Sequence, residues 1–422
     1  MTFASFEAAQ WFMLAAGFVI AFIMGAIANK TNFCTMGAVS DWVNMGDMGR
    51  FRSWLLAIAV ALIGVVALES VGLVEADNSF PPYRAGNLIW LENLLGGLIF
   101  GVGMTLASGC GNKCLVRIGG GNIKSIFVFL VIAVIAYFMV SPFPGTDATL
   151  YSTLFYPWMN PLSVSLESGQ DLGSMISGAE GALNTRLIIG LVLGVILLGF
   201  AFMSAEFRSS RDHVVGGLVI GLCVLAAWYV TSNIMVDADG DAMKLTDYYS
   251  EWDMLAESDE GKPAAGAGLS SQSFTFINPM GQAFGYGLGG FNSALLTFGI
   301  MAFFGVVAGS LVWSLISRTF RIEWFASFKD FITHIIGAVL MGFGGVLAMG
   351  CTIGQGITGI STLALGSFIT FIAIVLGSAL TMKVQLYKMV YEEEATLGKS
   401  LVAGLADMRL LPNGMRKLDK VD

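Results

Sequence analysis

Three of the five cysteines, Cys34, Cys110 and Cys351, each lie where an apolar segment breaks into a glycine-rich one. The segment that ends at Cys110 recurs 241 residues later, where 334–351 repeats 93–110 with seven identities in eighteen positions. The identities include the cysteine and the glycine before it. A thiol kept at a break in an internal repeat indicates that it has a function.

The setting of these cysteines suggests anion binding. A helix that restarts after each cysteine would direct unpaired N–H groups and the positive end of its dipole at the break. The neighbouring glycines, Gly109 and Gly350, would allow a sharp turn or the close approach of a ligand. A neutral thiol adds a weak S–H donor and a polarizable sulfur. The pattern predicts a site for a large, soft, sulfur-containing anion, held without a buried Lys or Arg.

The predicted substrate-binding residues are those at or beside the breaks. They are Cys34, Cys110, Cys351, Gly109, Gly350, Thr352, Gln355, Asn112 and Cys114. Packing explains Cys223, which lies inside an apolar segment, and explains Cys114 as well as function does. A disulfide is not expected, because the cysteines fall at different depths or within one short helix. We predict no catalytic residue, no cofactor and no metal, since the cysteines have no companion zinc ligands.

Composition defines the class of protein. The 422 residues are 55% hydrophobic and 12% charged, with a mean hydropathy of +0.75, which is typical of a polytopic helical membrane protein in contact with lipid. The apolar stretches are continuous, which excludes a β-barrel. The sequence has no Walker loop and no basic nucleic-acid-binding stripe, so we expect neither nucleotide hydrolysis nor a nucleic-acid partner.

The predicted fold class is therefore all-α, with about nine transmembrane helices and four short re-entrant half-helices. The spans are expected at roughly 11–29, 54–75, 91–108, 124–141, 186–204, 213–235, 292–317, 331–349 and 366–387. The half-helices are expected at 32–47, 112–121, 274–286 and 352–364, which are too polar to cross a bilayer yet too apolar for plain loops. Glu69 falls near the end of a span, where we expect it to snorkel to the interface.

Charge predicts the orientation. With the N-terminus outside, 18 of the 22 Lys and Arg residues fall on the cytoplasmic side. We therefore expect a multi-pass protein of the bacterial inner membrane, with a periplasmic N-terminus and a cytoplasmic C-terminus. The two breaks then open from opposite sides, as in the inverted repeats of secondary transporters. The predicted single domain, 1–422, comprises repeat 1 (about 11–141), a linking span (186–204), repeat 2 (about 213–387, with an acidic external insertion at 236–290) and a cytoplasmic tail (388–422).

Four motifs resemble the signatures of the YeeE/YedE membrane family. They are Asn-Phe-Cys-Thr-Met-Gly at 32–37, Ala-Ser-Gly-Cys at 107–110, Phe-Thr-Phe-Ile-Asn-Pro at 274–279 and Gly-Cys-Thr-Ile-Gly-Gln at 350–355. The resemblance implies sulfur transport, with short helices facing each other across a central path and Cys34, Cys110 and Cys351 relaying the substrate. It also implies a TusA-like cytoplasmic sulfur-carrier protein as a candidate partner. The long acidic insertion and Cys114 depart from the family pattern.

Our leading hypothesis is a transporter that imports thiosulfate or a related sulfur-containing anion. One alternative is a membrane thiol or persulfide sulfur-transfer enzyme that uses Cys110 and Cys114 as a dithiol. Another is a transporter of selenium compounds, with which YedE-type relatives are associated. A scaffold subunit that binds a soluble partner through its C-terminal tail would tolerate loss of all three cysteines.

Overall fold

The computed structural model describes residues 1–238, 240–252 and 268–421 as a bundle of long helices. Nine helical segments of this described part are long and apolar enough to cross a membrane, which confirms the prediction of an all-α, multi-pass membrane protein. Each of these segments contains one long helix. The nine are α1 (Phe6–Lys30), α3 (Gly49–Ser70), α4 (Trp90–Leu106), α6 (Ile123–Val140), α9 (Leu172–Phe202), α11 (Arg211–Ser232), α15 (Phe298–Ile316), α16 (Phe328–Leu347) and α17 (Leu365–Tyr391). Helix α9 begins well before the expected residue 186, and it is kinked at Gly178, whose φ is 68°.

Short helices lie in all four segments predicted as half-helices. They are α2 (Thr35–Ser40), which continues into the π-helix η1 (Asp41–Met45), then α5 (Gly111–Gly119), α14 (Ile277–Leu288) and the π-helix η4 (Gly354–Gly359). Whether these helices re-enter a bilayer stays a prediction.

The remaining elements lie in connections and at the ends of the chain. The small strands are β1 (Thr2–Phe3), β2 (Asn87–Leu88), β3 (Val164–Ser165), β4 (Met235–Ala238) and β5 (Asp241–Lys244). Strand β4 pairs parallel with β1, Thr2 opposite Met235, and antiparallel with β5, while β2 pairs antiparallel with β3. The short helices are α7 (Leu150–Leu154), α8 (Tyr156–Met159), α10 (Ala205–Ser209), α12 (Leu245–Ser250) and α18 (Leu397–Asp407), with 3₁₀ turns at Asn160–Leu162, Ser293–Leu295, Glu392–Glu394 and Asn413–Met415.

The packing of one half of the chain has counterparts in the other half. Helix α1 packs on α15 as α11 packs on α3, and α4 packs on α17 as α16 packs on α6. Helices α4 and α16 also cross each other closely. A Cβ at Gly103 would lie 2.7 Å from the Gly337 carbonyl oxygen, and a Cβ at Gly337 would lie 2.7 Å from that of Gly103. The repeated glycines therefore bring the two backbones together. The inverted repeat itself stays a prediction, which these paired contacts support.

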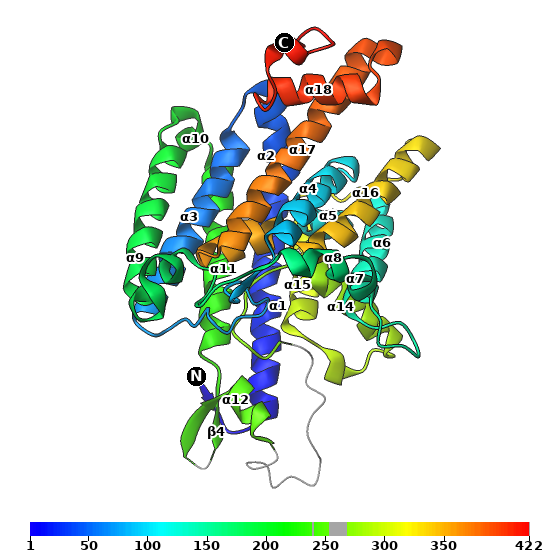
Figure 1. Cartoon of the computed structure of the whole chain (residues 1–422). Helices are drawn as coiled ribbons and strands as arrows, with labels where there is room; N and C mark the ends of the chain where they lie inside the picture. The colour runs from blue at the N-terminus through cyan, green and yellow to red at the C-terminus, as the bar shows by residue number, and fades with distance from the viewer. Residues whose placement is uncertain (239, 253–267, 422) are drawn as a thin grey trace.

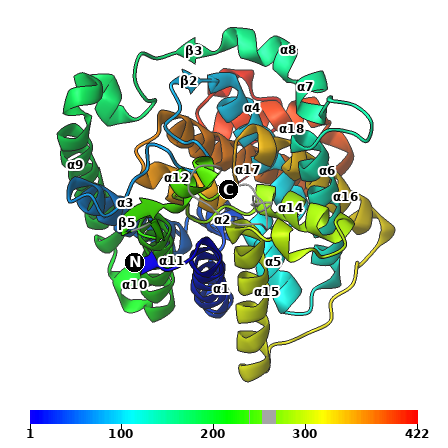
Figure 2. The same ribbon diagram turned by 90° about the horizontal axis from the view of Figure 1, so that it is seen from below.

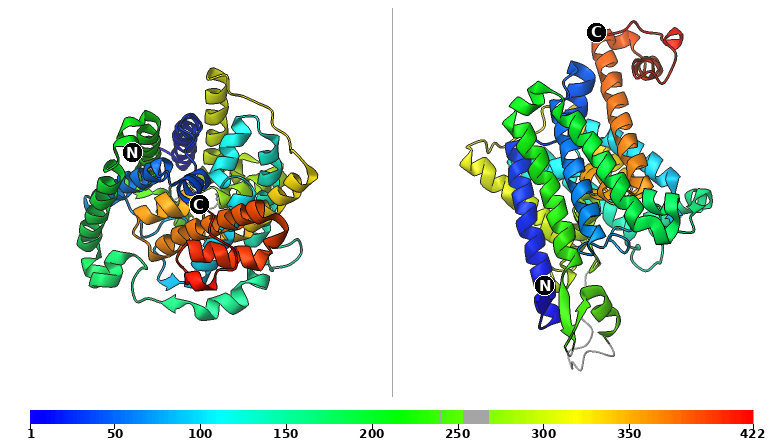
Figure 3. Two further views of the ribbon diagram at one scale, coloured as in Figure 1. Left: turned by 90° about the horizontal axis from the view of Figure 1, so that it is seen from above. Right: turned by 90° about the vertical axis from the view of Figure 1, so that its left-hand side faces the viewer.

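The two termini lie at opposite ends of the bundle (Figure 1). Helix α9 lies at its periphery, seen along the bundle in Figure 2, and it is the least buried of the nine spans of the described chain. Helix α17 extends beyond the other helices, with α18 near its end (Figure 3). Within the predicted acidic insertion, 239 and 253–267 lie outside the described residues.

Candidate functional site

Helices α1, α4 and α16 each end in a turn of the same type, and each of these turns leads to one of the three cysteines. The residue two positions before each cysteine has a left-handed backbone: Asn32 (φ 51°), Ser108 (φ 59°) and Met349 (φ 53°). The next residue donates its N–H to a carbonyl five positions earlier, which is a Schellman-type helix end. These bonds run from Phe33 to Ala28 (3.1 Å), from Gly109 to Met104 (2.8 Å) and from Gly350 to Gly345 (2.8 Å).

The glycines beside the cysteines do not take the left-handed conformation themselves. It falls on Ser108 and Met349, one residue earlier, where side chains other than glycine are uncommon. Gly109 and Gly350 instead allow close packing. A Cβ at Gly109 would lie 3.1 Å from Lys113 Cγ, and one at Gly350 would lie 3.2 Å from Thr275 Oγ1.

A helical turn restarts directly after each cysteine. Cys34 and Cys110 are the N-caps of α2 and α5, both with extended backbones. The carbonyl of each of the three cysteines accepts the first helical hydrogen bond, from Ala38 (2.9 Å), Cys114 (2.9 Å) and Gln355 (2.8 Å). The thiol lies among the free N–H groups of this first turn. Gly37 N–H donates to Cys34 Sγ over 3.4 Å, and the amides of Ile353, Gly354 and Phe276 lie within hydrogen-bonding range of the Cys351 sulfur.

The three thiols form one buried group, although they are far apart in sequence. Cys34, Cys110 and Cys351 are 4%, 2% and 0% exposed, and all three are free thiols. Cys110 lies within electrostatic range of both of the others. It is therefore the central member of the three, in the turn between α4 and α5.

Several buried polar atoms without partners lie beside these thiols or their turns. Among the described residues, seven buried side-chain atoms have no hydrogen-bond partner: Thr35 Oγ1, Trp54 Nε1, Tyr83 Oη, Asn112 Oδ1, Trp228 Nε1, Thr275 Oγ1 and Thr352 Oγ1. Thr35 and Thr352 directly follow Cys34 and Cys351, and the Thr352 hydroxyl lies beside the Cys110 thiol without forming a hydrogen bond of ordinary geometry. Buried polar groups are normally paired. The unpaired hydroxyls beside the cysteines therefore indicate a place where a polar ligand is accommodated.

Two of the predicted site residues already have partners within the protein. Gln355 donates to the Ala348 carbonyl and accepts from Ser367 Oγ at 2.6 Å, so its amide joins the end of α16 to the start of α17. Cys114 donates its S–H to the Ser125 carbonyl at 3.0 Å, which ties α5 to α6. Direct substrate contact by either residue stays a prediction.

Cationic side chains lie next to Cys34. Lys113 Nζ donates to Asn32 Oδ1 at 2.6 Å and lies within electrostatic range of Cys34 and Cys110. Arg50 is paired with Asp41 and also lies near Cys34. Because Asp41 neutralises Arg50, the positive charge at this end of the thiol group comes from Lys113, on the side where α1 ends.

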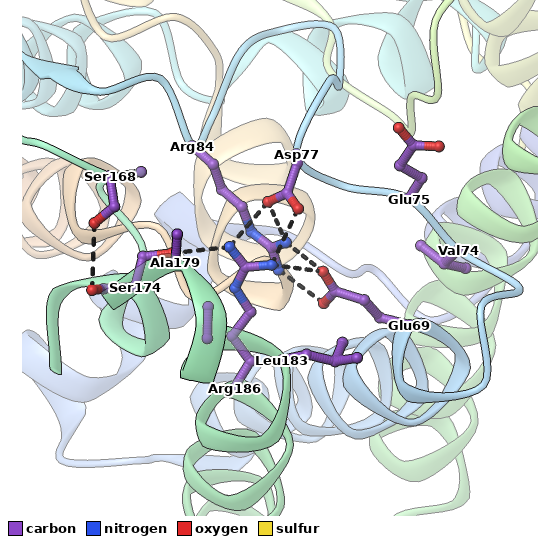
Figure 4. A pocket seen from close by; sticks show the side chains of 12 residues that line it. Glu69, Val74, Glu75, Asp77, Arg84, Ser168, Ser174, Ala179, Leu183 and Arg186 are labelled. Atoms are coloured by element: carbon purple, nitrogen blue, oxygen red, sulfur yellow. Dashed lines mark hydrogen bonds and ion pairs between the residues drawn. The ribbon is translucent and has the colours of Figure 1, made fainter. Parts of the chain in front are cut away.

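A cluster of buried ion pairs lies beside the segment that follows η4, away from the cationic side chains near Cys34. Arg84 makes two bonds to Glu69, at 2.5 and 2.9 Å, and Arg186 makes two to Asp171, at 2.7 and 2.9 Å. Both guanidinium groups also contact Asp77, and Figure 4 shows them meeting between Glu69 and Asp77. Arg84 Nε donates to the Thr362 carbonyl at 2.9 Å, which connects the cluster to the chain after Cys351.

The expectation that Glu69 snorkels to an interface is wrong. Glu69 is buried between Arg84 and Arg186, which neutralise it. Burial would raise the pKa of Asp171, but hydrogen bonds from Arg186 and Ser174 lower it to about 2. Sequence reasoning missed the cluster because nothing in the spacing of its members along the chain pairs them.

A cavity of about 430 Å³ opens beside this cluster. Its charged lining comprises Glu69, Glu75 and Asp77 against Arg84 and Arg186, so acidic side chains outnumber basic ones. Both basic side chains of this lining are already paired with carboxylates, so neither is free to hold an anion. The cluster is therefore better suited to holding structure than to binding the predicted substrate.

Sequence reasoning also missed several neighbours of the thiols. Tyr83 and Thr275 reach Cys351 and its turn from distant segments; no sequence signal marks Tyr83, whereas Thr275 lies in the motif at 274–279. Thr35 could have been found, since it follows Cys34 as Thr352 follows Cys351.

Substitution of Gly354 tests whether the turn after Cys351 must be this tight. A Cβ at Gly354 would lie 2.5 Å from Thr275 Oγ1 and 2.8 Å from its Cβ. We expect Gly354→Ala to lower stability by about 1–3 kcal/mol through overpacking, and to reduce uptake of labelled substrate because the turn must move. Gly398→Ala is the matched control, since Gly398 lies in open space in α18. Equal stability and uptake in the two variants would contradict the prediction.

Comparison with known proteins adds an independent observation. The family described as Sulphur transport matches residues 30–380. A thiosulfate transporter, TsuA, of Escherichia coli (strain K12) is 26% identical over 370 residues, which cover 86% of this chain and 92% of the relative. A protein of the same name from Spirochaeta thermophila is 23% identical over 384 residues, which cover 87% of this chain and 97% of the relative. The matched region includes all three cysteine turns.

Proposed function

The chain belongs to the Sulphur transport family, and from this we propose that it imports thiosulfate or a closely related sulfur-containing anion. The family is one of transporters, and the nine apolar helical segments of the described chain make this a multi-pass membrane carrier rather than an enzyme. The observation that carries the proposal is the meeting of three identical turns, each with a buried free thiol, among hydroxyls that lack partners.

The anion is held by neutral donors. Thiols offer S–H groups, Thr35 and Thr352 offer hydroxyls, and the first turn after each cysteine offers backbone N–H groups. Hydrogen bonds to a charged group contribute about 1.5–3 kcal/mol each, so a few of them offset part of the cost of moving the anion out of water. The polarizable sulfur of each thiol suits the terminal sulfur of thiosulfate better than it suits a hard oxyanion.

The anion passes from Cys351 to Cys110 and then to Cys34. The position of Cys110 within range of both other thiols supports this order. So does the position of Lys113 beside Cys34, because positive charge at that end would draw the anion onwards.

We place the protein in a bacterial inner membrane, with its N-terminus in the periplasm and its C-terminus in the cytoplasm. The distribution of Lys and Arg supports this orientation. Cys34 then lies on the cytoplasmic side, where a TusA-like sulfur-carrier protein would receive the sulfur. The resemblance to YeeE/YedE proteins supports this partner.

Uptake of labelled thiosulfate tests the proposal. In cells that lack other sulfur importers, we expect the protein to raise uptake well above that of cells with an empty vector. Excess unlabelled thiosulfate should abolish the signal, and the same excess of sulfate should not, because sulfate lacks the soft terminal sulfur. Competition by a selenium analogue would widen the substrate class. Uptake no greater than with the empty vector would refute the proposal.

A further inference from the structure

A second cavity, of about 590 Å³, lies along α14 and the end of α6. Its lining carries no charged side chain. Phe80 is one of its apolar members, and the polar ones are Asn278, Gln282, Thr297, Ser141, Tyr137 and Tyr286. The residues that form it come from the end of α6, from both ends of α14 and from the loop between α3 and α4. With the orientation proposed above, these parts of the chain lie on the periplasmic side.

The cavity continues towards Cys351 through a constriction. A narrow space of about 10 Å³ shares Phe80, Asn278 and Gln282 with it and reaches Thr275. Such a volume scarcely holds one water molecule. Phe80 borders both spaces together with Asn278 and Gln282, so the three lie at this constriction.

Thr275 connects the constriction with the turn at Cys351. Thr275 is 7% exposed, and its hydroxyl has no partner among the described residues. The side chain of Thr275 lies against the backbone of Gly354. The backbone of the next residue, Phe276, lies near the Cys351 sulfur. An unpaired buried hydroxyl therefore lies between the cavity and the first thiol.

The polar groups of the cavity are arranged as donors. Thr297 Oγ1 donates to Gln282 Oε1 at 2.7 Å, so the amide oxygen is occupied and the NH₂ group remains available. Asn278 lies one helical turn earlier on the same face of α14. The N-terminus of α14 has no side-chain cap, so the positive end of its dipole lies at the constriction. No carboxylate lines either space, which disfavours a metal cation.

We propose that this cavity is an outer binding site for the tetrahedral oxyanion end of thiosulfate or a related sulfur oxyanion. Gln282 and Asn278 donate to its oxygens before it passes Phe80 and Thr275 to reach Cys351. The inference rests on the proposed function, because it identifies where the same substrate binds first. The bound anion is held by neutral amide groups, as it is at the thiols.

Protection from labelling tests binding directly. The five native cysteines are buried, so a new thiol in Ser141→Cys, at a lining residue that leaves Gln282 and Asn278 in place, can be labelled selectively with a charged maleimide in the purified protein. We expect thiosulfate to slow this labelling at least tenfold. Ser293→Cys, on the exposed turn after α14, is the matched control, and it also corrects for reagent consumed by thiosulfate. Equal slowing at both positions would overturn the site.

Transport kinetics provide the second test. Replacing Gln282 or Asn278 with Leu removes donors that act before the thiols, so the KM for thiosulfate uptake should rise about 10- to 100-fold with little change in the maximal rate. Ser293→Ala should leave both values unchanged. A wild-type KM in both Leu variants would overturn the inference while leaving thiosulfate import intact. If the wild type imports no thiosulfate, the proposed function fails, and the labelling result still decides whether the cavity binds the anion.

Discussion

Cys110→Ala reduces thiosulfate uptake about 10- to 100-fold, which is the largest effect that we expect from a single thiol. Cys110 lies within range of both Cys34 and Cys351, so without it the anion loses the donor that joins the two ends of the path. The factor corresponds to the loss of one hydrogen bond to a charged group, about 1.5–3 kcal/mol. Initial rates of labelled uptake, normalised to the amount of protein in the membrane, measure it.

Two further variants separate hydrogen bonding from packing. Cys110→Ser keeps a donor of similar size and should recover part of the lost rate. Cys223→Ala removes a thiol that is equally buried but lies in α11, where it packs in the apolar core. It should transport like the wild type. Full activity in Cys110→Ala, or an equal loss in Cys223→Ala, would rule out a special role for the central thiol.

Asp171→Ala unfolds more easily than the wild type, by up to about 3–5 kcal/mol, because the buried Arg186 loses the carboxylate that makes two of its bonds and keeps only Glu69 and Asp77. Asp171 is fully buried, makes two bonds to Arg186, and caps α9 through the Ser174 amide at 2.9 Å. Asp171→Asn separates the two roles, since asparagine can still cap the helix but carries no charge. The free energy of unfolding of Asp171→Asn should therefore be about 1 kcal/mol higher than that of Asp171→Ala. Chemical unfolding in detergent measures the differences.

The pH dependence of this effect has a defined sign. The pKa of Asp171 is about 2 in the folded protein, below its ordinary value of 3.8. The contribution of ionised Asp171 to the stability of the fold is therefore complete above about pH 4 and is lost as the pH falls through about 2. The difference in stability between Asp171→Asn and the wild type should narrow over that range.

Arg321→Ala, in an exposed pair with Glu323, is the control and should lower the free energy of unfolding by less than about 1 kcal/mol. An equal cost at both sites would contradict the prediction.

The loss of Asp171 should also slow transport. The residue before it, Gln170, accepts from the Leu365 amide, and the residue after it, Leu172, donates to the Leu363 carbonyl. These bonds hold the segment between η4 and α17, just after the Cys351 turn. The ion cluster is thus a fixed support for one wall of the path.

The helices and the breaks could be predicted from sequence because their signals are local. Hydropathy over about twenty residues defines a span. The shared Gly-Cys pairs at 109–110 and 350–351 mark two breaks without any knowledge of the fold. The same repeat predicted that α4 and α16 play equivalent parts, and their glycines do pack against each other.

The surroundings of the thiols could not be predicted, because they come from distant parts of the chain. Tyr83 lies in one connection and Thr275 in another, and only the packed bundle brings them to Cys351. The pairing of Glu69 with Arg84 and Arg186 is likewise tertiary, which is why a carboxylate near the end of a span was misread as snorkelling.

The left-handed residues before the cysteines have a practical consequence. Asn32, Ser108 and Met349 hold a conformation that costs residues other than glycine about 1–2 kcal/mol each. The assembled bundle, rather than local preference, therefore keeps these bends in place. A preparation loosened by harsh detergent or gentle heating would lose the alignment of the three sulfurs while its long helices persist. Circular dichroism would then overstate the fraction of working transporter in such a sample.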